Sequence, residues 1–184
     1  MNRTLNFALI FVLGMYLSPH VIAKSTTKNE SGHHHSKSKK HKRTFAVGVT
    51  YDANGILWLA KIKDKKLLVS NSNDNGETFS TPVVVTPEAE NIYADGENRP
   101  KLAVAEDGTV LLTWSKKQSK KYSGDIRFSR STDSGKTFSL PITLNDDGLI
   151  TGHRFDSLTI NEKGRVIISW LDARDRDAAR NKNE

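Results

Sequence analysis

The sequence predicts an all-β chain built from repeated four-stranded antiparallel units. The first observation is an eight-residue pattern, Ser-x-Asp-x-Gly-x-Thr-Phe, at residues 72–79 and again 59 positions later at residues 131–138. The second is that short apolar and β-branched runs flank both copies. The third is a weaker repeat, because Gly108 and Gly164 lie 56 residues apart and each precedes a tryptophan by six positions. The glycines and the tryptophans thus repeat at the same spacing, which is close to that of the eight-residue pattern, and this indicates a modular β architecture.

Both copies of the pattern have the chemistry of a hairpin turn, and we call them the first and second turn motifs. The Asp carboxylate can accept backbone N–H groups just ahead of it, and the Gly can take a positive φ. The Phe ring needs burial, so we expect it to pin the turn to the sheet beneath. Each motif is therefore predicted to connect two antiparallel strands. The residues with this structural role are Ser72, Asp74, Gly76, Thr78, Phe79, Ser131, Asp133, Gly135, Thr137 and Phe138.

Strand-like runs fill two complete units and part of a third. In the first unit they lie at residues 45–51, 56–62, 66–70 and 82–86. In the second unit they lie at residues 101–105, 110–114, 125–129 and 141–144. A third unit opens with runs at residues 157–160 and 166–171, and no third copy of the motif follows before residue 184.

Four-stranded units of this length are typical of β-propeller blades. We place blades at about residues 44–97 and 98–150, and an incomplete blade at residues 151–184. This is about 2.4 blades, whereas propellers usually hold four to eight. We therefore expect a partial β-propeller that needs missing blades or a partner to close, with residues 172–184 in an interrupted inter-strand loop.

The first 43 residues differ in composition from the rest. Residues 1–23 read as a secretory signal peptide, with Arg3 before an apolar run and Ala23 at the cleavage position. The run is too short to span a bilayer, and no cysteine is available for a lipid anchor. We expect a secreted or periplasmic protein without a membrane anchor after cleavage; an uncleaved anchor is the alternative. Residues 24–43 are predicted to be a disordered basic linker.

The linker also holds a group of histidines whose imidazoles can bind divalent Zn, Cu or Ni. They are His33, His34, His35 and His41. A polar spacer is the alternative interpretation, and no other cofactor is expected. The net charge of +7 comes from the same part of the chain, because residues 44–184 hold 20 basic and 20 acidic residues. We therefore expect no nucleic-acid interface.

The turn motif resembles the Asp-box, or BNR repeat, of sialidases and related β-propellers. In that family the box is structural and lies between the third and fourth strands of a blade. Further residues are similar to the family's substrate site, namely Arg154, the sequence Asp172-Ala173-Arg174, and Asp177. The resemblance implies that Arg154 and Arg174 bind substrate and that Asp177 is the catalytic acid or base. The chain departs from the family where Phe155-Asp156 replaces Ile-Pro and where Asp177 comes early.

Strand direction places such a site away from the turn motifs. In an up-and-down blade, the approach to the first strand and the loop between the second and third strands share one face. Arg99, Arg154 and residues 172–177 fall on that face, and the turn motifs fall on the other. Converging arginines suit a carboxylate ligand, because guanidinium binds carboxylate through a planar fork. Structural roles for Arg99 and Arg154, and a solvated charged loop at 172–177, are the alternatives.

Three functional hypotheses remain open. The first is an exported, sialidase-like Asp-box repeat protein that binds a glycan or another carboxylate-bearing ligand without complete hydrolase machinery. The second is the N-terminal part of an exo-sialidase, a glycoside hydrolase of terminal sialic acids; the resemblance implies that its nucleophilic Tyr and Glu partner lie in later blades. The third is a periplasmic metal-binding protein that uses the linker histidines. Enzymatic activity is thus left open.

Overall fold

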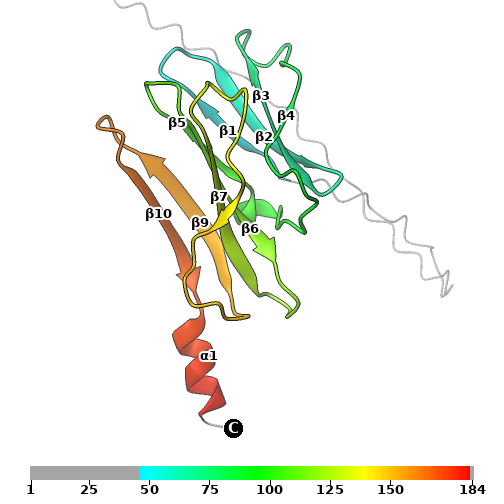
Figure 1. Ribbon diagram of the computed structural model, residues 1–184, viewed down its shortest axis with the longest axis vertical. Helices are drawn as coiled ribbons and strands as arrows, with labels where there is room; N and C mark the ends of the chain where they lie inside the picture. Colours follow the sequence, from blue (N-terminus) through cyan, green and yellow to red (C-terminus); the bar gives the residue numbers. More distant parts are fainter. Residues whose placement is uncertain (1–45, 183–184) are drawn as a thin grey trace, which may run out of the picture. The chain divides into compact units, whose positions relative to one another are not determined.

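The computed structural model describes residues 46–182, which form a partial β-propeller (Figure 1). The predicted signal peptide and linker, with the four linker histidines, lie outside the described residues. The first blade is an antiparallel sheet of β1 (Gly48–Tyr51), β2 (Leu57–Lys63), β3 (Lys66–Ser72) and β4 (Val83–Val84). The second blade contains β5 (Lys101–Val104), β6 (Val110–Lys117), β7 (Gly124–Ser131) and β8 (Ile142–Thr143), after the 3-10 turn Gly96–Asn98. The third sheet pairs β9 (His153–Ile160) with β10 (Val166–Asp172).

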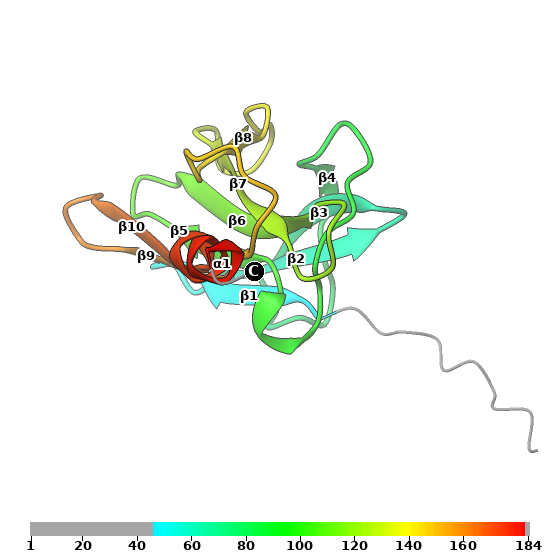
Figure 2. The ribbon, with the colours of Figure 1, turned by 90° about the horizontal axis from the view of Figure 1, so that it is seen from below.

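The three sheets lie side by side, with the first strand of each next to that of its neighbour (Figure 2). Strand β1 contacts β5, and β5 contacts β9. One hydrophobic cluster joins the first and second blades. Its largest members are Trp58, Leu67, Leu112 and Trp114, all buried. The core therefore lies between blades, which is how stacked sheets bury their apolar sides.

Several strand ends differ from the expected ones by a few residues, and two differences bear on the segment that follows β10 and on the start of β9. Strand β9 begins at His153 rather than at residue 157, because backbone pairing with β10 extends back to His153. Residues 172–182 are not an interrupted loop as expected, since β10 includes Asp172 and helix α1 covers Arg174–Asn181. Asp175 and Asp177 in its first turn and Arg180 in its last turn match the helix dipole, which stabilises a short helix. No helix among residues 46–182 is long and apolar enough to cross a bilayer.

The turn motifs adopt the predicted hairpin geometry. In the first motif, Asp74 accepts hydrogen bonds from Ser72 Oγ at 2.6 Å and from the backbone N–H of Thr78 at 2.9 Å. Ser72 Oγ in turn accepts the N–H of Gly76 at 2.8 Å. The second motif repeats these contacts at Asp133, with distances of 2.7, 2.9 and 2.9 Å. In the first motif, the hydrogen bonds from Ser72 and then from Thr78 are the main causes that lower the pKa of Asp74 to about 2.

The expectation that each motif's Phe is buried is met in part by the second motif, whose Phe138 is half-buried, and is wrong for the first. Phe138 of the second motif packs against the cluster between the first and second blades. Phe79 of the first motif is 42% exposed. The motif that includes Phe138 lies against the blade before it, whereas no blade precedes the first one among the described residues. Burial of this ring therefore depends on a neighbouring blade rather than on the hairpin itself.

Candidate functional site

A pocket of about 480 Å³ opens where the second blade meets the third sheet. It lies on the face that carries the β6–β7 loop, the approach to β9 and the start of α1, and we call this the loop face. The turn motifs join third to fourth strands and so lie at the other ends of the strands, as predicted. The pocket is lined by Tyr122, Gly152, Arg154, Phe155, Leu171, Asp172, Ala173, Arg176 and Arg180.

Backbone hydrogen bonds fix the two walls of this pocket to each other. The N–H of Gly124, at the start of β7, donates to the Thr151 carbonyl at 3.0 Å. The N–H of Ala173, just before α1, donates to the Gly152 carbonyl at 3.0 Å. The approach to β9 is thus held between the second blade and the first residues of α1. The pocket is part of the fold rather than a gap between separate loops.

Arg154 is the central cation of the pocket. Its guanidinium carbon lies 4.4 Å from the ring centre of Tyr93, 4.7 Å from that of Phe155 and 5.7 Å from that of Tyr122. These distances are in the range of cation–π contacts. Its Nε is buried without a hydrogen-bond partner, and no ion pair to Arg154 is found within residues 46–182. Aromatic rings thus hold the guanidinium in place while its charge is not matched by a carboxylate.

A β-bulge shapes the wall next to Arg154. Pairing of β9 with β10 shifts by one residue between Ser169 and Leu171, so that one extra residue of β9 faces β10. Phe155 lies in this bulge with a φ of 58°, a left-handed backbone that a bulky residue seldom adopts. Its N–H donates to the buried Asn98 side chain at 3.3 Å. Bulges often redirect side chains beside functional sites, and this one sets Phe155 beside the pocket.

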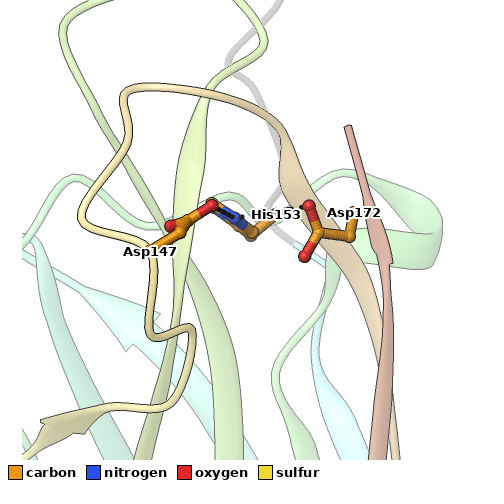
Figure 3. Close-up of side chains that lie close together, drawn as sticks. All are labelled: Asp147, His153 and Asp172. Carbon is orange, nitrogen blue, oxygen red and sulfur yellow. Dashed lines mark hydrogen bonds and ion pairs between the residues drawn. The ribbon is translucent and has the colours of Figure 1, made fainter. Parts of the chain in front are cut away.

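A buried histidine, His153, lies between two carboxyl groups behind the pocket (Figure 3). His153 Nδ1 lies 2.9 Å from the Gly124 carbonyl oxygen, and Nε2 lies 3.0 Å from Asp147 Oδ2 and 3.6 Å from Asp172 Oδ1. Strand pairing places Asp172 directly opposite His153. Figure 3 shows the imidazole between the two carboxyl groups. Sequence analysis did not identify His153 or Asp147 as site residues.

Arg174 joins the same group. Its guanidinium lies 2.7 Å from Asp172, 3.4 Å from Asp147 and 3.2 Å from Asp146. Hydrogen bonding from Arg174 is the main reason that the pKa of Asp172 falls to about 2, and the same contact holds the pKa of Arg174 above its usual range. Arg174 is therefore engaged by three carboxylates, which leaves it less free than Arg154 to bind a ligand.

Asp147, His153 and Asp172 have the donor atoms of a metal site, since their nearest ligand atoms lie within 4.8 Å of one another. The contact of Nδ1 with the Gly124 carbonyl is also the outer contact that metal-bound histidines usually make. However, Arg174 already supplies positive charge to both carboxylates. A divalent cation would have to compete with this guanidinium. Metal binding by the linker histidines stays a prediction, because they lie outside the described residues.

Asp177 and Arg99 make contacts that do not involve Arg154. Asp177 Oδ2 accepts a hydrogen bond from Thr151 Oγ1 at 2.6 Å, and this bond keeps the pKa of Asp177 below its usual value. A carboxyl with a lowered pKa is a poor proton donor near neutral pH. Arg99 is exposed, donates to the Gly96 carbonyl at 3.3 Å and does not line the pocket. Of the predicted ligand-binding residues, the structure brings Arg154 alone into direct contact with the pocket.

Solved structures with a similar fold are β-propeller glycosidases. The α-L-arabinofuranosidase from Fusarium graminearum, solved with an iminosugar inhibitor, is 19% identical with a TM-score of 0.53 and matches 72% of this chain and 42% of its own. An α-L-arabinanase from Penicillium chrysogenum, solved with arabinobiose, is 22% identical with a TM-score of 0.52 and matches 73% of this chain and 43% of its own. These likenesses show the fold alone.

A Hadza microbial sialidase is 16% identical with a TM-score of 0.49, which is too low to support an argument. It matches 70% of this chain and 32% of its own. No protein-family model matches the sequence, and no curated protein shows significant similarity to it. The chain spans less than half the length of the solved structures that it resembles. The partial propeller is thus supported, whereas the sialidase-like and Asp-box assignments remain proposals.

Proposed function

We propose that this chain is an exported, sialidase-like propeller segment that binds a carboxylate-bearing glycan in the pocket beside Arg154. The observation that carries the proposal is the state of Arg154, whose guanidinium lines the pocket with no carboxylate partner in the described part of the chain. Guanidinium binds a carboxylate through two parallel hydrogen bonds. Arg176 and Arg180 line the same pocket and add positive charge.

The rest of the pocket suits a sugar. Tyr122 and Phe155 line its wall together with Gly152. Binding pockets for small molecules commonly combine apolar and aromatic walls with a few polar groups. The propellers of similar fold include an arabinanase solved with arabinobiose, so the same scaffold binds carbohydrate in at least that protein. The unmatched charge of Arg154 favours an acidic sugar over a neutral one.

Binding without hydrolysis fits the carboxylates in and beside the pocket, Asp172 and Asp177. Glycoside hydrolysis generally needs one carboxyl group that holds its proton near neutral pH and a second that is ionised. Asp172 and Asp177 both have pKa values below the usual one, the first because of Arg174 and the second because of Thr151. Neither is poised as a proton donor. The alternative function, the N-terminal part of an exo-sialidase, needs a proton donor and a nucleophile from outside these residues.

Calorimetric titration with N-acetylneuraminic acid and with arabinobiose tests the proposal. We expect heat of binding with the acidic sugar and little with the neutral one. Arg154→Gln removes the charge and should weaken binding by about tenfold or more, in line with the loss of a charge-assisted pair. The matched control is Arg130→Gln, an exposed arginine of β7 near the second turn motif, which should leave affinity unchanged.

Two results would count against this function. Equal binding of both sugars, or loss of binding in Arg130→Gln but not in Arg154→Gln, would remove the role of Arg154. Release of a fluorescent reporter from a sialic-acid conjugate by the purified chain would favour the exo-sialidase alternative. Because the lowered pKa of Asp177 makes it a poor proton donor, Asp177→Asn should leave such activity unchanged, and a loss in this variant would assign the proton transfer to Asp177.

A further inference from the structure

A smaller pocket of about 130 Å³ adjoins the pocket beside Arg154. The two pockets share four lining residues, which are Tyr122, Gly152, Arg176 and Arg180. The β6–β7 loop, the approach to β9 and helix α1 form the walls of the smaller pocket, so it also lies on the loop face. We call it the basic pocket, because its charged lining residues are Lys120, Lys121, Arg176, Asp177 and Arg180.

The two pockets hold more positive than negative charge. Together they are lined by five basic residues and two acidic ones. One of the acids, Asp172, is matched by Arg174 at 2.7 Å, and Arg174 does not line either pocket. The other acid, Asp177, lies 3.4 Å from Arg176 and 3.9 Å from Lys120. Among the lining residues, Asp177 is therefore the carboxylate left to offset the basic side chains of both pockets.

Three of these cations have no ion-pair partner in the part of the chain that the structure describes, namely Lys121, Arg154 and Arg180. Residues 44–184 carry equal numbers of basic and acidic residues, so this excess is a local property of the two pockets. A ligand with a single carboxylate beside Arg154 would leave the cations of the basic pocket unmatched. A second negative group on the same ligand would match them, which is favourable even at a protein surface.

Tyr122 links the cations of the two pockets. Its ring centre lies 4.8 Å from Lys121 Nζ and 5.7 Å from the guanidinium carbon of Arg154. The side chain is 62% exposed, and its φ of 65° is a left-handed backbone that a bulky residue seldom adopts. Backbone outliers of this kind gather at ligand-binding sites. An exposed ring shared by two pockets suits a sugar ligand that extends from one pocket into the other.

Hydrogen bonds hold the loop that carries the lysines in place relative to Arg154. The carbonyl of Lys120 accepts the backbone N–H of Ser123 at 3.1 Å and its hydroxyl at 2.6 Å. The Ser123 carbonyl accepts the Tyr93 hydroxyl at 3.1 Å, and both of these residues are buried. Tyr93 is also the ring that stacks on Arg154 at 4.4 Å. One tyrosine thus fixes both Arg154 and the lysine loop, which lowers the cost of ordering them when a ligand binds.

We propose that the basic pocket is a second subsite, and that the ligand is an oligosaccharide with a negatively charged group on each of two neighbouring sugar units. The inference rests on the proposed function, because one of the two groups lies beside Arg154. The other lies among Lys120, Lys121 and Arg180, and the sugar between them contacts Tyr122. Because both groups belong to one molecule, binding of the first raises the effective concentration of the second at its subsite.

Calorimetric titration with two matched sugars tests this inference. One is the dimer of N-acetylneuraminic acid, in which both units carry a carboxylate. The other is sialyllactose, in which the same acidic unit is followed by neutral sugars. We expect the dimer to bind tighter by about fivefold or more, which is what one or two exposed ion pairs contribute.

Replacement of the two loop lysines locates the second subsite. Lys120→Gln combined with Lys121→Gln should lower the affinity for the dimer to that for sialyllactose, and should change the affinity for sialyllactose by less than about twofold. The matched control is Lys63→Gln combined with Lys65→Gln, two exposed lysines at the corresponding β2–β3 turn of the first blade, which line neither pocket. The control removes the same net charge, so unchanged affinities there would show that contact rather than long-range attraction is responsible.

Three results would each overturn the inference: equal affinities for the two sugars, equal weakening of both sugars when Lys120 and Lys121 are replaced, or the same loss in the control. These results leave the proposed function intact as long as Arg154→Gln still weakens binding of N-acetylneuraminic acid itself. If Arg154→Gln leaves binding of that monosaccharide unchanged, the proposed function fails instead. The two failures are therefore distinguishable.

Discussion

Gly135 of the second turn motif lies against the indole ring of Trp58 in the first blade. A β-carbon at position 135 would come within 2.6 Å of Trp58 Cζ3 and 2.9 Å of Cη2. Gly135 also has a φ of +77°, in the left-handed region that favours glycine. The motif therefore has two functions in this fold. Its side chains close a hairpin within one blade, and its glycine lets that hairpin approach the blade before it.

Replacement of Gly135 separates the cost of the left-handed backbone from the cost of the close contact with Trp58. Gly135→Ala should destabilise the fold by about 1 kcal/mol for the left-handed backbone and by about 1–3 kcal/mol more for the contact with Trp58. Gly55→Ala is a matched control, because Gly55 has the same φ of +77° and nothing within 4 Å of its β-carbon position. Urea unfolding of both variants gives the comparison. Equal losses of stability would show that the Trp58 contact is not tight.

The carboxylates of the turn motifs predict how stability depends on pH. Hydrogen bonds from Ser72 and then Thr78 lower the pKa of Asp74 to about 2 from a usual value of 3.8. An acid whose pKa is lowered by folding stabilises the folded state fully above its unfolded value and loses this contribution as the pH falls through the folded value. The stabilisation from Asp74 is therefore present above about pH 4 and is lost towards pH 2.

Thermal melting of the unaltered protein and of Asp74→Asn between pH 5 and pH 2 measures this contribution. The difference in Tm should be largest at pH 5 and should shrink as the pH approaches 2. Glu106→Gln serves as the control, because Glu106 is an exposed carboxyl in the turn between β5 and β6. A Tm difference that is constant with pH would show that the Asp74 carboxylate does not close the turn.

The ion pair between Arg174 and Asp172 gives a third prediction. Arg174 is the main cause of the pKa of about 2 at Asp172, so Arg174→Gln should raise that pKa towards 3.8. Carboxyl-carbon NMR during a pH titration reports this shift directly. Asp74 is an internal control in the same spectra, because its pKa depends on Ser72 and Thr78. An unchanged Asp172 pKa would mean that the backbone N–H of residue 174, which the substitution keeps, rather than the guanidinium holds this carboxylate ionised.

Strand topology was predictable because each turn motif is a local structure. Asp74 bonds to groups within four residues of itself, and Asp133 does the same. The strands on either side are then antiparallel wherever the hairpin forms. The placement of the motifs away from the loop face follows from this alternation. The fold class was therefore correct although several strand ends were misplaced.

The pocket was only partly predictable. Arg154 was identified, but its stacking partner Tyr93 precedes it by 61 positions and comes from before the second blade. His153 was not identified as a site residue, and its strand was expected to begin four residues later. Extending that strand back would have paired positions 153 and 172 only if the bulge at Phe155 were known. A one-residue change of register moves every side chain to the opposite face.

The sequence by itself determined the repeated hairpins, because each hairpin depends on residues close together in the chain. Only the tertiary structure decided which charges are matched. Arg174 is held by three carboxylates, whereas Arg154 is held by rings from the connection between the first two blades and from the bulge. Both are arginines near the start or end of a strand, and the packing of one sheet against the next makes them chemically different.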